Sequence, residues 1–518
     1  MSDFYPHQQV LLYAAGVFIL VSLIFFVNGK TRGSLAWLTA GGLCLGLFAA
    51  GLDPFLNSWD ERFHALVAKH MMNAPFRPML ICDPVLPYDY RNWTANHIWV
   101  HKPPLFLWQI ALTFKLLGVS EFSLRLPSAL MTAGLIPVIY RLGRIAVSGR
   151  VGYYSAFLYT VSAYPLLLLT GYVNLDHNDV AFIFYVTASL WAHAEYDRSG
   201  RRLWLLPIGL FAGCAALVKW LTGLLVFGGW GLALLGDSKR RRQFRPYLDI
   251  GLSLAVALAV FLPWQWYIST TYPLESAYTR LLYWRHVVEV MDGHAGTSGY
   301  HFWMLALQYG AWAPWLIVPA LIILWRRMSS QRLKIAWATC VLAIYAFFSF
   351  IVKTKMCSFC FTVCSIIYVA FGTVLGLVID SLPQTRFPRL ARLLTIGLLA
   401  GVGWSTLDLA GFARDHASLK WDNRYRLAKL HNTALYKTLP SLLPLNDFIV
   451  FNCGEHRNVE LMFYTDFTAY THVPSRPEYE LLKSRHIHMA VFDDDRIPGY
   501  LMDDSAVFKI KPCLMDTR

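Results

Sequence analysis

Residues 103–118 read PPLFLWQIALTFKLLG, and the side on which every later loop lies depends on whether this stretch crosses a bilayer. The stretch is apolar, but it is short and Lys115 interrupts its end. A helix that spans the hydrocarbon core needs roughly 17–25 predominantly apolar residues. We therefore predict a helix that lies along the membrane surface, inside one large outer loop over residues 53–124.

The composition of the whole chain indicates a polytopic α-helical membrane protein. Of 518 residues, 56% are hydrophobic and only 15% are charged, and the mean hydropathy is +0.42. Ordinary soluble domains do not have this balance. We expect about twelve transmembrane helices, at residues 10–27, 35–52, 125–142, 151–170, 179–196, 203–217, 220–236, 248–267, 302–325, 335–352, 357–379 and 393–410.

Basic residues mark every second short connection between these spans. They lie at residues 30–32, 141–150, 198–202, 239–245, 326–334 and 386–392. The positive-inside rule places such connections in the cytoplasm, so the intervening loops and the C-terminal part lie outside. The net charge of +14 then reflects topology and lipid contact, and no nucleic-acid partner is expected.

The two ends of the chain are predicted to form separate units. Residues 1–34 lack the features of a cleaved signal peptide and read as an extra N-terminal anchor. Residues 35–410 hold the remaining spans. After about residue 411 the composition becomes mixed, with strand patterns at 447–452, 488–493 and 506–510 and an amphipathic helix at 476–485. Residues 411–518 are therefore expected to form a small extracytoplasmic α/β domain, in which a Cys453–Cys513 disulfide is one option.

Acidic and basic side chains collect on the predicted outer side. Asp60 and Glu61 follow a span, and Asp176 and Asp179 precede another; the basic members are Lys102, Lys219, Lys353 and Lys355. Any one of them is more often a residue that marks the membrane boundary. Together, carboxylates and lysines at one boundary suit a reaction in which a hydroxyl loses a proton while a phosphate leaves.

Several longer motifs resemble one family of enzymes. They are HKPPLFLWQIALTFKLLGVSEFSLRLPSAL (101–130), LDHND (175–179), LVKW (217–220) and YGAWAPWLIVPAL (309–321). In this order they resemble the polyprenyl-phosphate-sugar-dependent glycosyltransferases of the GT-C fold. Within that fold, the chain is most similar to the branch of the lipid A aminoarabinose transferase and the protein O-mannosyltransferases. The resemblance covers about residues 35 to 380.

The resemblance implies a GT-C fold with a large first outer loop that carries surface helices. It also implies transfer of a sugar, with inversion, from a polyprenyl-phosphate donor to lipid A, another envelope glycan or a protein. Asp60 would be the general base, with Glu61 beside it. The second acidic site matches Asp179 best and Asp176 next, while the family places Lys102 and Lys219 near the donor phosphate, where Lys353 or Lys355 can join them.

The chain also departs from the family pattern. Relatives often have an arginine three residues after the essential acid, where this chain has Phe63, and a basic residue near Glu289. Arg285 and His286, one turn before Glu289, are then candidates to bind the donor. No cofactor is expected with certainty. A divalent metal ion is possible, but structural or substrate-contacting roles are favoured for His286, His294 and His301, with Asp292 nearby.

Two other functions compete with this interpretation. A transporter or lipid flippase would also be polytopic, but internal inverted repeats are expected of it and none is visible. A non-catalytic anchor for the C-terminal domain would not require the charged outer loop. We therefore expect an enzyme of the bacterial inner (cytoplasmic) membrane that acts as a monomer on its outer side, with membrane lipid, the lipid-linked sugar and the acceptor as partners.

Overall fold

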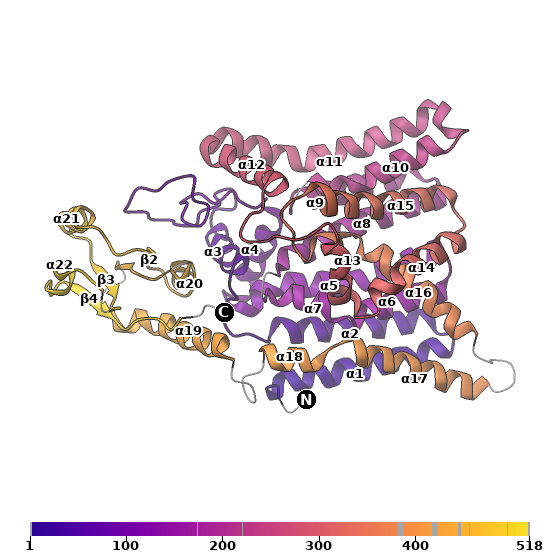
Figure 1. Cartoon of the computed structure of the whole chain (residues 1–518), viewed down its shortest axis with the longest axis horizontal. Coiled ribbons are helices and arrows are strands. Elements are labelled where there is room, and N and C mark those ends of the chain that lie inside the picture. Colours follow the sequence, from indigo (N-terminus) through magenta and orange to yellow (C-terminus); the bar gives the residue numbers. More distant parts are fainter. Residues whose placement is uncertain are drawn as a thin grey trace.

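Long helices run side by side through most of the molecule, and a small domain projects from one end of the bundle (Figure 1). The computed structural model describes residues 3–172, 175–219, 221–381, 388–416, 423–443, 447–454, 456–494 and 496–515. Arg386, in one of the predicted cytoplasmic connections, lies outside these residues. The predicted boundaries of the N-terminal anchor, the catalytic part and the C-terminal part are not tested by this arrangement and stay predictions.

Helices long and apolar enough to cross a bilayer confirm a multi-pass membrane protein. Among the described residues there are seven: α1 (Pro6–Val27), α2 (Thr31–Ala50), α5 (Glu121–Ala146), α11 (Phe244–Thr271), Gln331–Ile351, Phe359–Asp380 and Arg389–His416. The last three ranges contain α15 (Gln331–Ala346), α16 (Cys364–Asp380), and α17 (Pro388–Thr406) with α18 (Leu409–His416). The pair α13 (Tyr300–Tyr309) and α14 (Ala313–Arg327), bent by 91°, raises the number to eight if it forms one span.

The other predicted spans are helical, but they are short, interrupted or, in the 23-residue α8, less apolar. Residues 151–170 divide into α6 (Gly149–Thr160) and α7 (Ala163–Thr170), and the rest correspond to α8 (His177–Ser199), α9 (Leu205–Ala216) and α10 (Leu225–Gly236). Their length or composition does not identify them as spans. The expected number of about twelve transmembrane helices therefore stays a prediction.

The stretch at 103–118 forms a short helix, α4 (Leu105–Leu117), which packs against α3 (Asp60–Met71) and α5. Its 13 residues are too few to cross a bilayer. Phe106, Ile110 and Phe114 lie on its buried face, whereas Leu116 is exposed. Gly118 ends the helix at φ +86°, a conformation that glycine adopts without steric cost. The chain then turns into α5, and the membrane topology inferred from a short surface helix stays a prediction.

The C-terminal domain contains a four-stranded parallel sheet of order β2-β1-β3-β4. The strands are β1 (Ile449–Phe451), β2 (Thr468–Ala469), β3 (Met489–Phe492) and β4 (Val507–Ile510); the helices are α19 (Arg424–Leu442), α20 (Arg457–Tyr464), α21 (Arg476–Ser484) and α22 (Gly499–Met502). Short apolar runs such as Ile449–Phe451 suit parallel strands covered on both faces. The predicted α/β domain is confirmed, with Cys453 and Cys513 both free.

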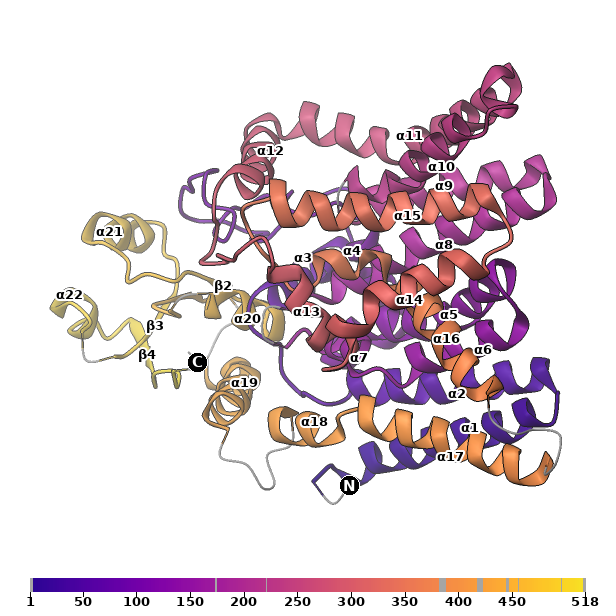
Figure 2. The ribbon, with the colours of Figure 1, turned by 45° about the vertical axis from the view of Figure 1, so that its right-hand side comes forward.

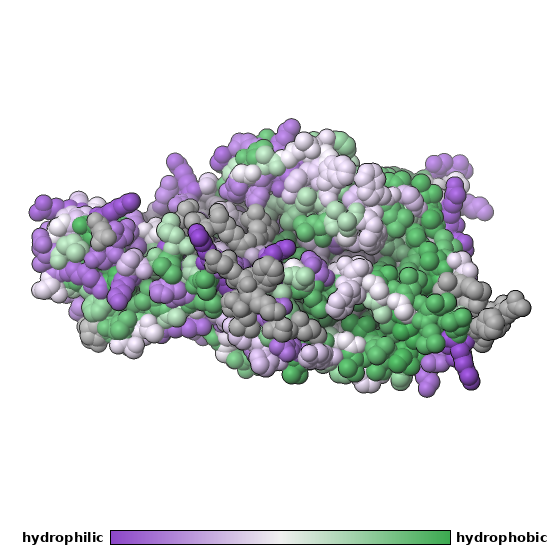
Figure 3. Space-filling view, turned by 60° about the horizontal axis from the view of Figure 1, so that its bottom comes forward, coloured by the Kyte–Doolittle hydropathy of each residue, from purple (hydrophilic) through white to green (hydrophobic). Residues whose placement is uncertain are grey.

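The charged outer segments gather at one end of the bundle. Figures 1 and 2 both show α3, α12 (Pro273–Val288) and the C-terminal domain at this end, and α20 packs directly against α3. The turn with the basic residues 240–242 lies at the opposite end (Figure 1). On the face drawn in Figure 3, hydrophobic surface covers the bundle, while the projecting domain is largely hydrophilic. This distribution suits a bundle in lipid with a domain in water.

A close helix crossing offers a test of this packing. A Cβ on Gly152 in α6 would lie 2.3 Å from the backbone oxygen of Tyr140 in α5. Gly152→Ala should therefore push the two helices apart and lower stability by about 1–3 kcal/mol, measured as a lower midpoint of thermal unfolding in detergent. In Gly228→Ala the new Cβ meets nothing within 4 Å, so this helical control should keep or raise the midpoint. Equal midpoints for both variants would contradict the crossing.

Candidate active site

The segment before α3 turns sharply and directs two acidic side chains in different directions. Trp59 has φ 78°, which is rare for a bulky residue, and Asp60 begins the helix. Carboxylates in a first helical turn are stabilised by the helix dipole. Successive helical residues point about 100° apart, so Asp60 and Glu61 meet different partners.

Glu61 is paired with Arg125 of α5 in the interior. The Nε of Arg125 lies 2.7 Å from Oε1 of Glu61, and its Nη2 lies 2.9 Å from Oε2. Both residues are buried. The same guanidinium also donates to the carbonyl oxygens of Asp53 and Phe55, at 2.7 and 2.8 Å. The carboxylate of Glu61 thus holds the α2–α3 segment against α5, and its catalytic role stays a prediction.

Lys102 lies between two other carboxylates. Its Nζ is 3.1 Å from Oδ2 of Asp60 and 3.6 Å from Oδ2 of Asp176. Asp176 is the N-cap of α8, and its Oδ1 accepts a hydrogen bond of 2.8 Å from the backbone N–H of Asn178. The start of α3, the loop before α4 and the start of α8 therefore meet at one largely buried ammonium.

The pKa values of the two carboxylates in this cluster shift in opposite directions. Burial raises the pKa of Asp60, but the charge and hydrogen bond of Lys102, together with the nearby His64 and His101, outweigh burial and hold that pKa below its ordinary value. Burial and then the charge of Asp60 raise the pKa of Asp176 to about 7, although Lys102 acts in the opposite direction. Burial lowers the pKa of Lys102, yet Asp60 and Asp176 more than compensate and raise it. In the chain without bound ions, Asp60 is ionised and Lys102 is protonated at neutral pH.

A second ion pair lies one turn further along α8. Asp179 pairs with Lys219, and Nζ of Lys219 also lies 5.6 Å from the ring centroid of Phe359. From the sequence, Asp179 is expected ahead of Asp176 as the second acidic site. In the structure Asp176 shares Lys102 with Asp60, whereas Asp179 faces Lys219, and the choice between them stays a prediction.

The remaining predicted binding residues have partners other than Asp60, Lys102 and Asp176. Arg285 pairs with Glu289 at 2.8 Å, with both side chains partly exposed. His286 Nε2 lies 3.7 Å from Asp292. Lys353 is exposed. Lys355 is buried, but its Nζ donates to backbone oxygens at the end of the α15 segment, including that of Ser349 at 2.9 Å. Lys355 therefore caps the C-terminal end of the helical segment Gln331–Ile351.

Aromatic rings surround the carboxylate pair, and sequence reasoning did not identify them. Trp93 stacks on His101 with ring centroids 4.4 Å apart, and it lies 6.4 Å from Trp59. His456, from the C-terminal domain, lies 5.7 Å from Trp59. Tyr283 of α12 donates a hydrogen bond to the carbonyl oxygen of His101. These rings come from segments distant in sequence, so only the tertiary structure assembles them.

The C-terminal domain is fixed to the opposite face of α3. Arg62 Nη1 lies 3.1 Å from Oε1 of Glu460, which also pairs with buried Lys429. Lys69 donates to the backbone oxygen of Thr465 at 2.7 Å. As its helical position indicates, Arg62 points away from Asp60 and does not replace the arginine expected at position 63.

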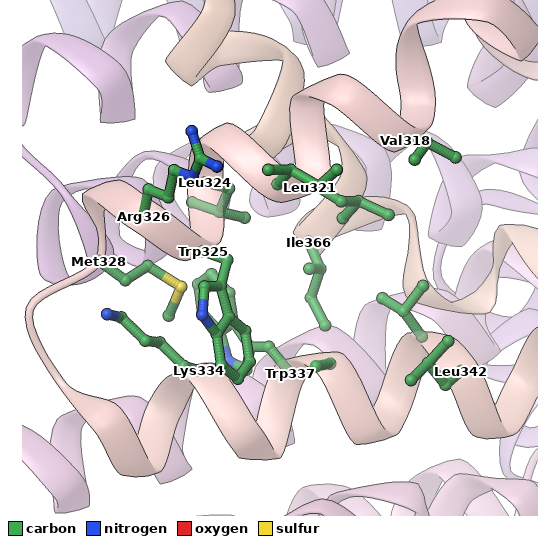
Figure 4. Close-up of a pocket in the computed structure, with 13 residues that line it drawn as sticks. Val318, Leu321, Leu324, Trp325, Arg326, Met328, Lys334, Trp337, Leu342 and Ile366 are labelled. Carbon is green, nitrogen blue, oxygen red and sulfur yellow. The ribbon is translucent and has the colours of Figure 1, made fainter.

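Two other features have properties of binding sites: an apolar cavity and a cluster of three side chains. An apolar cavity of about 430 Å³ lies among α14, α15 and α16, lined by Leu321, Trp325, Trp337 and Ile366 (Figure 4). None of the predicted site residues lines it. The second feature is the group His64, Asp176 and His177 beside Lys102. Imidazole and carboxylate side chains bind metal ions, and the potential ligand atoms of these three residues all lie within 4.8 Å of one another.

Comparisons with known proteins support the same fold. Residues 101–267 match the family model described as dolichyl-phosphate-mannose-protein mannosyltransferase. The chain is 28% identical over 270 residues to undecaprenyl phosphate-alpha-4-amino-4-deoxy-L-arabinose arabinosyl transferase 1 of Pseudomonas fluorescens Pf-5, covering 49% of this chain and 47% of the relative. It is 30% identical over 276 residues to the corresponding transferase of Pseudomonas aeruginosa LESB58, with the same coverage of 49% and 47%. The chain spans about half the length of the curated relatives it matches.

Solved structures extend the likeness over most of the chain. ArnT from Cupriavidus metallidurans bound to undecaprenyl phosphate superimposes with a TM-score of 0.64 at 15% identity, covering 92% of this chain and 90% of ArnT. The oligosaccharyltransferase AglB from Archaeoglobus fulgidus gives 0.56 at 14% identity, covering 84% of this chain and 64% of AglB. The predicted GT-C fold and the resemblance to its lipid-phosphate-dependent glycosyltransferases are confirmed.

The buried Glu61–Arg125 pair provides a stability test. Glu61→Gln should leave the Arg125 guanidinium buried without its counter-charge and cost about 3–5 kcal/mol, seen as a lower midpoint of thermal unfolding in detergent. The exposed pair Arg285–Glu289 is the matched control, since Glu289→Gln should cost at most about 1 kcal/mol. Similar losses for the two variants would show that the buried pair does not fix the α2–α3 segment.

Proposed function

We propose that this chain is a membrane glycosyltransferase that moves a sugar from a polyprenyl-phosphate donor to an acceptor on the outer side of the membrane. The observation that carries the proposal is the largely buried ammonium of Lys102, held between Asp60 at the start of α3 and Asp176 at the start of α8. A cation for a departing phosphate and a carboxylate for a hydroxyl proton are the two groups that this transfer needs.

The reaction can be followed bond by bond. The acceptor oxygen attacks the anomeric carbon, its proton passes to the carboxylate of Asp60, and the bond between that carbon and the phosphate oxygen breaks. The lipid phosphate leaves with the electron pair and is stabilised by Lys102. Attack from the face opposite the phosphate inverts the anomeric centre. The protein therefore contributes position, a base and a fixed positive charge.

The shared ammonium also couples donor binding to the strength of the base. While Lys102 faces Asp60, it holds the pKa of that carboxyl low, which makes Asp60 a weak base. A donor phosphate that attracts Lys102 takes part of this interaction away from Asp60. The pKa of Asp60 then rises when the donor is in place. Lys219, held by Asp179 in the adjacent turn of α8, is proposed as a second cation for the phosphate.

The relatives suggest the class of donor and the membrane. Curated relatives are named undecaprenyl phosphate aminoarabinose transferases, and the similar structures carry undecaprenyl phosphate or a dolichol-phosphate. We infer an undecaprenyl-phosphate-linked sugar as donor, in the bacterial inner membrane, with the site on the periplasmic side. Lipid A, another envelope glycan or a protein is the proposed class of acceptor.

The position of the site disfavours a transporter. Transporter sites generally lie near the bilayer midplane, at the interface of internal repeats. Here α3, whose first residue Asp60 pairs with Lys102, lies at the end of the bundle that also carries α12 and the C-terminal domain (Figures 1 and 2). Such a position suits a reaction between a lipid-anchored donor and an acceptor that arrives from the aqueous side.

Transfer of label from radiolabelled polyprenyl-phosphate sugars tests the proposal in membranes that contain the native chain, Asp60→Asn or Lys102→Gln. Both variants should lose transfer by about 10²-fold or more, because one removes the base and the other the charge that stabilises the leaving group. Lys115→Gln, at an exposed position on α4, should transfer at the native rate.

Two results would contradict the proposal. Native transfer by Asp60→Asn would remove this carboxylate from the role of base. Absence of transfer by the folded native chain with every donor in the mixture would favour the transporter.

A further inference from the structure

Two histidines and a carboxylate converge beside Lys102. Nδ1 of His64 lies 3.3 Å from Nε2 of His177 and 3.6 Å from Oδ1 of Asp176. The three residues come from two segments more than a hundred positions apart, α3 and the start of α8, and all are buried. Among the described residues, this is the one group of at least three His, Cys, Asp or Glu side chains whose potential ligand atoms all lie within 4.8 Å of one another.

Surrounding contacts hold the three groups in this arrangement. The N-cap hydrogen bond from the N–H of Asn178 fixes the carboxylate of Asp176. The ring of Phe106 meets both imidazoles edge-on, with centroids 4.9 Å from His177 and 5.9 Å from His64. Such packed rings keep their orientation without a bound ion, so the cost of organising the ligands is already met by the fold.

Hydrogen bonding within the protein does not use all of these polar atoms. Nε2 of His64, Nδ1 of His177 and Oδ2 of Asp176 are buried and have no hydrogen-bond partner among the described residues. One proton between the two rings satisfies Nδ1 of His64 and Nε2 of His177 but does not involve Asp176, whose Oδ1 accepts from the N–H of Asn178. A cation among Nδ1 of His64, Nε2 of His177 and Asp176 uses a lone pair from each residue.

We propose that His64, Asp176 and His177 bind a divalent transition-metal ion of the zinc class. In a tetrahedral zinc site with bonds of about 2.0–2.1 Å, neighbouring ligand atoms lie about 3.3 Å apart. The observed 3.3 and 3.6 Å match this spacing with little movement. Two imidazoles and one carboxylate suit zinc, whereas Mg²⁺ and Ca²⁺ prefer oxygen ligands alone. Three protein ligands leave one coordination position open.

The histidines singled out from the sequence do not form a comparable group. His286 faces Asp292 at 3.7 Å, while His301 lies buried near Phe348 and Phe359. Within the described part of the chain, neither belongs to a group of three potential ligands. The proposed site therefore replaces the loop 286–301 as the place for a metal ion.

The ion would also act on the carboxylate cluster, and this part rests on the proposed function. Asp176 is shared with Lys102, so a bound ion would fix its orientation toward Lys102. It would add positive charge beside the proposed position of the donor phosphate. Metal binding itself requires no donor and can be measured without transfer.

Metal content of the full chain tests the site directly. The native chain and three variants, His64→Gln, His177→Gln and His70→Gln, are purified in detergent with a tag that contains no histidine. Each is incubated with zinc and desalted, and its zinc is measured by mass spectrometry. The native chain and His70→Gln should retain about one zinc ion per chain, because His70 instead faces the carbonyl oxygen of Met79. His64→Gln and His177→Gln should each lose at least tenfold in bound zinc.

Thermal unfolding distinguishes loss of the ion from loss of the fold. A chelator should lower the unfolding midpoint of the native chain, zinc should restore it and magnesium should not. The same treatments should leave the midpoint of His177→Gln unchanged. A native chain that unfolds cooperatively but retains less than a tenth of an equivalent of zinc would overturn the proposal, as would zinc retained by both variants. A native chain that retains one zinc ion but transfers no sugar would instead contradict the proposed function alone.

Discussion

The attraction between one lysine and two carboxylates organises this structure. Lys102 loses most of its contact with water between Asp60 and Asp176, and a largely buried charge is tolerated only when it is paired. The loop before α4 and the first turns of α3 and α8 are therefore held together, although they are far apart in the sequence. The Glu61–Arg125 pair fixes the same turn of α3 from the other side. One acidic dipeptide thus serves two purposes: Asp60 faces the site and Glu61 fixes the scaffold.

The arrangement of the membrane part and the C-terminal domain follows from the same constraint. Because α4 is too short to cross a bilayer, Lys102 stays on the side that carries α3. The domain built on the parallel sheet docks on α3 through Arg62 and Glu460 and brings His456 near Trp59. A charged site at the end of the bundle is consequently bounded by lipid-facing helices on one side and by a domain in water on the other. This arrangement suits a reaction between a lipid-linked donor and a polar acceptor.

Sequence reasoning predicted the membrane class, the short helix α4 and three of the four C-terminal strands, because long apolar runs and short buried strands leave local patterns. The two-residue β2 left no such pattern. Asp60 and Lys102 were identified as candidates, but their shared contact with Asp176 was not. Asp179 was preferred because the helix continues directly after it, whereas the N-cap position turns Asp176 toward Lys102. His64 and His177 resemble ordinary buried histidines until the contact of α3 with α8 places them together.

The most direct measurement of the central claim is a cryo-electron microscopy structure of the chain with a non-transferable analogue of a polyprenyl-phosphate sugar. The account predicts a phosphate oxygen within hydrogen-bond distance of Nζ of Lys102, with the anomeric carbon on the side of Asp60. A phosphate bound instead at Arg285 and Lys353, with Lys102 still enclosed by its two carboxylates, would contradict the account.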